Sequence, residues 1–117
     1  MPDEETRYRL LRALEANPEL SQREIATELG ISVGKANYCL RALMDKGWVK
    51  LGNVRRNPNK RAYVYLLTPN GLKERARVTR RFLQRKRAEY ETLEREIEQL
   101  RREVEDRGGP ASDAGET

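Results

Sequence analysis

Apolar residues in the first half of the chain recur at helical spacing in three segments, and this pattern predicts three short helices. The first helix runs from about residue 3 to residue 16 and ends before Pro18, because a residue that precedes proline disfavours the helical conformation. Its apolar face consists of Tyr8, Leu10, Leu11 and Leu14. The second and third helices fall between residues 20 and 48.

Residues typical of helix ends mark these second and third helices. Ser21 and Glu24 have the spacing of a capping box, and Gly30 can adopt the left-handed conformation that ends a helix. Ser32 then caps the third helix, which ends at Gly47. The predicted buried stripe of this helix is Val33, Ala36, Leu40, Leu43 and Met44. Two helices joined by a short glycine turn form a helix-turn-helix, a motif that reads DNA.

A basic hairpin follows the helix-turn-helix. Residues 48–53 and 61–67 are predicted strands, and residues 54–60 form a polar turn rich in Arg, Asn and Pro. A helix-turn-helix followed by such a hairpin is a winged helix. We therefore predict a mainly α fold with a small β-hairpin, in which residues 1–71 form the winged helix-turn-helix domain.

A long helix completes the predicted fold. Thr68 is a suitable N-cap with Pro69 at the first helical position, and no Gly or Pro interrupts residues 72–107. Such a helix is roughly 55 Å long at 1.5 Å per residue. Its apolar residues repeat at alternating intervals of four and three, the heptad pattern of a coiled coil. The predicted dimerisation seam comprises Leu83, Tyr90, Leu93, Ile97, Leu100 and Val104. Residues 108–117 are predicted to be a disordered tail.

The direction of this coiled coil stays open. Branched side chains at one seam position with Leu at the other favour a parallel pair, in which Glu96 faces Arg101 of a second copy. The same pairing places Glu89 opposite Glu94, where the two carboxylates repel each other. A lone charged helix, stabilised by its own pairs at i,i+4 spacing, is the alternative to a dimer.

Positive charge is concentrated in the middle of the chain. Residues 32–87 contain sixteen Lys or Arg against two acids, a net charge of +14, whereas residues 1–31 and 88–117 have net charges of −3 and −6. A basic block that coincides with the helix-turn-helix and the hairpin is typical of phosphate neutralisation. A solvated basic face is the alternative. The basic residues within 73–87 either contact phosphate or cover acidic surface near the first helix.

Composition argues against several other classes of protein. The 117 residues have a mean hydropathy of −0.93, lack an apolar run of membrane-spanning length and begin with a polar, acidic segment unlike a signal peptide. We therefore expect a cytoplasmic protein that does not associate with membranes. One cysteine and no histidine argue against an internal disulfide or a structural zinc site, so no metal or cofactor is expected. Cys39 is expected to pack as a small hydrophobe, and Tyr63 and Tyr65 to belong to the core or an interface.

The candidate DNA-binding residues lie at the start of the second helix, on the third helix with its cap, and on the hairpin. With the predicted apolar stripe turned inward, the outward side chains can donate to guanine or phosphate or contact a thymine methyl group. Ordinary surface residues are the alternative for each position. The predicted DNA-binding set is Ser21, Gln22, Ser32, Gly34, Lys35, Asn37, Tyr38, Arg41, Arg55, Arg56, Lys60 and Arg61.

The segments LSQREIA, GISVGKANYCLRAL and LLTPNG together resemble the MarR-like winged-helix transcriptional regulators of bacteria. Within them the chain looks like the group described as EPS-associated, meaning linked to exopolysaccharide genes. The likeness covers roughly residues 7–107 and implies that Arg61 is the wing arginine that reaches the minor groove. The chain differs from typical MarR proteins in lacking an additional N-terminal dimerisation helix and in having one long C-terminal helix instead of two.

The sequence thus predicts a homodimeric regulator of transcription, a repressor in our interpretation, that binds specific double-stranded DNA. Residues 32–46 would enter the major groove, and residues 54–61 would contact the minor groove or the backbone. The alternative is a winged-helix adaptor that binds a protein partner through its coiled coil and DNA only nonspecifically. Catalysis is not expected, because the chain lacks histidine and a Gly-rich phosphate loop. The sequence identifies no small-molecule effector.

Overall fold

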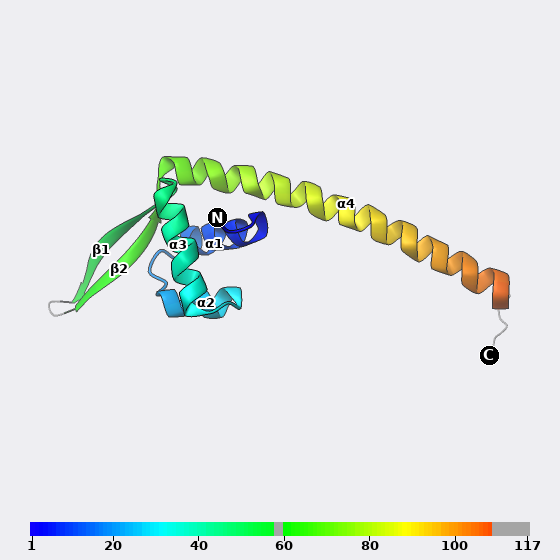
Figure 1. The fold of residues 1–117 in the computed structure, drawn as a ribbon, viewed down its shortest axis with the longest axis horizontal. Coiled ribbons are helices and arrows are strands. Elements are labelled where there is room, and N and C mark those ends of the chain that lie inside the picture. The colour runs from blue at the N-terminus through cyan, green and yellow to red at the C-terminus, as the bar shows by residue number, and fades with distance from the viewer. Residues whose placement is uncertain (58–59, 109–117) are drawn as a thin grey trace. The chain divides into compact units, whose positions relative to one another are not determined.

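The helices and strands follow one another in the predicted order in the computed structural model of the chain, which describes residues 1–57 and 60–108, with the backbone alone at 54–57, 60–62 and 108. The elements are α1 (Glu4–Ala16), α2 (Gln22–Leu29), α3 (Val33–Asp45), β1 (Val49–Asn57), β2 (Lys60–Leu67) and α4 (Pro69–Gly108) (Figure 1). The predicted fold class, mainly helical with one hairpin and a long C-terminal helix, is confirmed.

Local hydrogen bonds at the helix ends fix α2 and the turn into α3. The Ser21 hydroxyl accepts from the Glu24 N–H at 3.1 Å, and the Glu24 carboxylate accepts from the Ser21 N–H at 2.8 Å, so the predicted capping box is present. Gly30 has a φ of 72°, and the Ile31 N–H donates to the Ala26 carbonyl at 2.9 Å. This is the hydrogen bond of a Schellman motif, and it sets the tight turn between the two helices.

The start of α4 is joined to the end of α3 through backbone contacts. The Thr68 N–H donates to the Trp48 carbonyl at 3.0 Å, and the Thr68 hydroxyl donates to the Gly47 carbonyl and accepts from the Gly71 N–H. A Cβ atom at Gly71 would lie 1.9 Å from the Trp48 carbonyl oxygen. Only glycine fits at this crossing, because any side chain would collide with backbone.

The core forms where α1, α2, α3, the base of the hairpin and the first turns of α4 meet. Its largest fully buried side chains are Leu10, Leu11, Leu14, Ile25, Leu40, Leu43, Val78 and Cys39. Val33 was expected in this core, but 42% of its surface is exposed, so that expectation was wrong. The buried stripe of α3 is centred on Ala36 and Leu43 and includes Cys39, which turns Val33 out to the edge.

The hairpin is longer than the sequence suggested. Residues 54–57 and Lys60, which were expected in the turn, continue the strands β1 and β2. The antiparallel register pairs Leu51 with Tyr65 and Arg55 with Arg61, and a bulge lies between Arg55 and Asn57. Charged residues do not end these strands, because the hydrogen bonds between strands join backbone groups whatever the side chains are. Residues 58 and 59 lie outside the described chain.

Ion pairs and a ring contact hold the first turns of α4 against α1. The rings of Tyr8 and Phe82 stack with centroids 4.7 Å apart. The pairs between the two helices are Arg75 with Glu15, Arg81 with Glu4, and Arg7 with the buried Glu74, which also pairs with Arg77 within α4. Basic residues of the run 73–87, among them Arg75, Arg77 and Arg81, therefore pair with acids. The chain divides into units 1–82 and 83–117, so the first unit includes the start of α4 and extends beyond the predicted domain of residues 1–71.

The second unit consists of the rest of α4, in which every side chain of residues 83–107 is exposed. Pairs within the helix support it, such as Lys86 with Glu89 at 3.2 Å and Arg102 with Glu98 at 3.4 Å. The helix ends at Gly108. The rest of the predicted tail, residues 109–117, lies outside the described residues.

Candidate nucleic-acid interface

The outward face of α3 carries the main candidates for base contact. Lys35, Tyr38 and Arg41 are exposed, and Tyr38 exposes 56% of its surface. Asn37 is half-buried at the edge of this face, as expected. The main-chain amine of Met1 donates to the Tyr38 hydroxyl at 2.9 Å. The predicted orientation of α3 is therefore confirmed for these side chains, while their contact with DNA stays a prediction.

Gly34 lies on the same face, and the fold does not require a glycine there. A Cβ atom at this position would meet only the Ser32 hydroxyl at 4.0 Å, and the backbone is helical. Glycine in a helix costs about 0.5–1 kcal/mol relative to alanine. No contact within the described residues of 1–82 requires a glycine at position 34. A glycine there is compatible with another molecule approaching this face of the helix.

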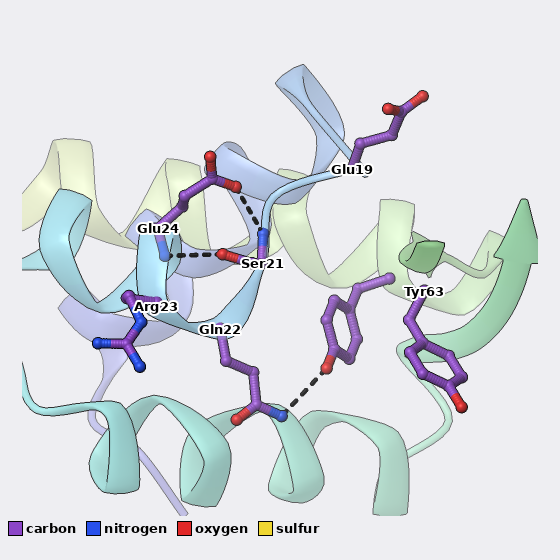
Figure 2. Close-up of a pocket in the computed structure, with 7 residues that line it drawn as sticks. Glu19, Ser21, Gln22, Arg23, Glu24 and Tyr63 are labelled. Carbon is purple, nitrogen blue, oxygen red and sulfur yellow. Dashed lines mark hydrogen bonds between the residues drawn. The ribbon is translucent and has the colours of Figure 1, made fainter. Parts of the chain in front are cut away.

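Three predicted DNA ligands are used inside the fold. The hydroxyls of Ser21 and Ser32 accept hydrogen bonds from the N–H groups of Glu24 and Lys35, at 3.1 and 3.0 Å. The Gln22 amide donates to the Tyr65 hydroxyl at 3.1 Å (Figure 2). These bonds fix the N-terminal turns of α2 and α3. Contact of the same side chains with phosphate stays a prediction.

An open cleft of about 690 Å³ lies between the start of α2 and β2 (Figure 2). Its lining comprises Glu19, Ser21, Gln22, Arg23, Glu24, Tyr63 and Tyr65. Tyr65 is 8% exposed and belongs to the core, as expected, whereas Tyr63 is 63% exposed. Two carboxylates against one guanidinium disfavour a phosphate inside the cleft, although Ser21 and Gln22 of its lining belong to the predicted DNA-binding set.

The hairpin residues Arg55, Arg56, Lys60 and Arg61 lie in the paired strands, with Arg55 opposite Arg61 and Asn57 opposite Lys60. Their side chains lie outside the part of the chain that the structure describes. Their predicted contact with the backbone or the minor groove is therefore untested.

Cys39 has the buried position expected of a small hydrophobe. Its side chain is fully buried in the core, and this burial raises the pKa of the thiol above its ordinary value. The nearby Lys35 opposes the shift but does not reverse it. A neutral, inaccessible thiol is a poor redox sensor, so the packing interpretation is confirmed.

The predicted seam residues lie along the exposed α4 segment with large apolar areas uncovered. Their exposed fractions are 50% for Leu83, 62% for Tyr90, 52% for Leu93, 45% for Ile97, 59% for Leu100 and 68% for Val104. Their pairing with a second helix stays a prediction.

Residues 3–50 match the family described as winged helix-turn-helix DNA-binding. No curated protein sequence matches the chain. Among the described helices, none combines the length and the apolar composition of a membrane span. Within the same residues, no group of three or more His, Cys, Asp or Glu side chains is placed to hold a metal ion.

Several solved structures share the fold. A MarR/EmrR family transcriptional regulator from Acinetobacter sp. ADP1 is 20% identical, with 86% of this chain and 75% of that chain covered and a TM-score of 0.58. MepR, a regulator of the Staphylococcus aureus efflux pump MepA, is 23% identical, with 86% and 74% covered and a TM-score of 0.57.

The DNA-binding protein Sso10a-2 from Sulfolobus solfataricus is similar over nearly its whole length. It is 22% identical, with 86% of this chain and 97% of that chain covered and a TM-score of 0.60. At these identities the likenesses establish the fold, which is the winged helix of MarR-type regulators and of Sso10a-2.

Proposed function

We propose that this chain is a homodimeric regulator of transcription of the MarR type that binds specific sequences in double-stranded DNA and acts as a repressor. The observation that carries the proposal is the outward face of α3, which exposes donors beside a glycine that the fold does not need. The second helix of a helix-turn-helix enters the major groove, where such donors meet base edges. The finer grouping with EPS-associated regulators is supported by the sequence motifs alone.

In this arrangement the side chains of α3 have distinct roles. Lys35 and Arg41 donate to guanine or phosphate, and Tyr38 contacts a thymine methyl group or a phosphate. The hairpin supplies positive charge to the backbone and the minor groove through Arg55, Arg56, Lys60 and Arg61. The net charge of +14 over residues 32–87 supports this role, because it includes both α3 and the hairpin.

The seam of α4 is the surface through which a second copy would bind. An isolated helix with an apolar stripe gains little stability in water, and burying that stripe against a partner removes apolar surface from solvent. The heptad spacing from Leu83 to Val104 fits the same helix of another copy, because both would present matching apolar layers. Pairing places two winged lobes on one assembly, which would engage half-sites separated by about one helical turn or a multiple of it.

Selection of bound fragments from random duplex DNA tests the proposal. We expect one recovered sequence made of two related half-sites, bound about 10³-fold or more tightly than random duplex at physiological salt. Equal affinity for selected and random DNA would contradict sequence-specific binding and favour the adaptor. Recovery of a sequence with a single half-site would contradict the pairing of two winged domains. It would leave base contact by α3 in place.

A further inference from the structure

Val33 is an exposed apolar residue at the first position of α3. Its exposed fraction is 42%, although its neighbours at Ala36 and Leu40 are fully buried. The N-cap role belongs to the preceding residue, Ser32, so Val33 does not cap the helix. A β-branched residue also has a lower helix propensity than alanine, so local helix formation does not favour it here.

The surroundings of Val33 leave its methyl groups accessible from outside. Gly34 follows it and has open space where a side chain would be. The nearest charged side chain along α3 is Lys35, which lies on the opposite flank of the helix at about 100° per residue. The N-terminal tip of α3 therefore presents a small apolar surface at the Val33 edge, away from the side chain of Lys35.

The N-terminal residues of a recognition helix are the ones that contact base edges. Among the four bases, thymine alone presents an apolar group in the major groove, its C5 methyl. We propose that Val33 packs against a thymine methyl group and so specifies a thymine in each half-site. This inference rests on the proposed function, and it assigns one thymine to an aliphatic side chain, separately from the contact proposed for Tyr38.

Replacing single thymines by deoxyuridine tests the proposal, because it removes the methyl group and leaves base pairing intact. The duplex is the one selected by the full chain, and each thymine is replaced in turn. For the natural chain we expect one position in each half-site to lose about four-fold in affinity, which corresponds to roughly 0.8 kcal/mol for a buried methyl-sized group at 1.4 kcal/mol per ten-fold. Val33→Ala should bind the thymine duplex about four-fold more weakly and no longer distinguish it from the deoxyuridine duplex.

Lys35→Ala is the matched control, since it removes an exposed side chain from the same turn. It should weaken binding to both duplexes equally and retain the four-fold preference for thymine. Val33→Thr keeps the branched shape with one methyl group and should retain part of the preference. A preference that survives unchanged in Val33→Ala, or no thymine at which the natural chain discriminates, would overturn the assignment. Failure of the natural chain to select any sequence would instead remove the proposed function and this inference together.

Discussion

The two units of the chain differ in where their apolar residues lie. Residues 1–82 contain a buried apolar core, in which Leu10, Leu40 and Val78 are fully inaccessible. Along residues 83–107, by contrast, all side chains are exposed, including those at the seam positions. The first unit carries the interactions of a folded domain within one chain, whereas the second leaves the apolar residues of its heptad pattern exposed.

This difference separates two kinds of sequence constraint. In the first unit, caps, glycines and buried side chains serve the stability of the chain itself. In the second, we propose that the heptad pattern serves association with another copy. Substitutions in the two units are therefore expected to affect different properties.

The largest effect is expected at Gly71. Gly71→Ala places a Cβ atom against the Trp48 carbonyl oxygen, so α4 must shift away from the α3–β1 junction. Overpacking of this kind lowers the free energy of unfolding by about 1–3 kcal/mol. We expect a loss near the upper end of this range, because the new Cβ atom meets backbone, which cannot rotate away as a side chain can. Thermal unfolding followed by circular dichroism should show the loss. Gly34→Ala is the matched control and should raise stability by about 0.5–1 kcal/mol, because its Cβ has open space. Equal stability of the two variants would contradict the close approach.

The next largest effect concerns association. Ile97→Asp combined with Leu100→Asp should dissociate the dimer, because two charges at the seam cannot be buried without partners. Sedimentation should then give a monomer, while the thermal unfolding of the lobe changes little. Thr92→Asp with Gln99→Asp adds the same charges outside the seam and should leave the dimer intact. Dissociation by both pairs of substitutions would mean that charge rather than seam position controls association.

A smaller effect is expected on the DNA-binding face. Replacing Lys35, Tyr38 or Arg41 by Ala removes an exposed side chain and should leave the fold intact. Replacing a side chain that contacts a base should cost about 1–3 kcal/mol of binding free energy at the selected site and less on random duplex. Fluorescence anisotropy with both duplexes measures the difference. Equal losses on both duplexes for all three variants would contradict base reading by α3.

The smallest effect concerns Cys39. Because burial raises the pKa of its thiol, the reactive thiolate is scarcer at neutral pH than in an exposed cysteine. A thiol reagent should therefore label the native chain much more slowly than the urea-unfolded chain. Labelling should accelerate as pH rises toward the thiol pKa. Rapid labelling of the native chain would mean that the lobe opens at this position.

Local signals predicted most of the first unit from the sequence. The capping box at Ser21, the left-handed Gly30 and the Thr68-Pro69 start of α4 are short-range features, and each appears as expected. Val33 was misplaced because Cys39 was not counted in the buried stripe, and including it rotates that stripe by a fraction of a turn. The strands are longer than the sequence pattern indicates, because charged residues do not end the ladder.

Long-range features were harder to predict. The pairing of Arg75 with Glu15 and of Arg81 with Glu4 depends on how α4 crosses α1, which no local pattern determines. The close approach at Gly71 likewise becomes visible only when distant segments are placed together. The candidate DNA-binding face could be predicted because helical periodicity alone decides which side chains of α3 point outward, apart from the edge occupied by Val33.

Sedimentation of the full chain beside a chain that ends at Arg87 tests most directly whether the two units divide folding from association. We predict a dimer for the full chain and a folded monomer for the shortened one, which should bind a single half-site weakly because it has lost its tethered second lobe. A shortened chain that remains a tight dimer would contradict this division and would place the interface within residues 1–87.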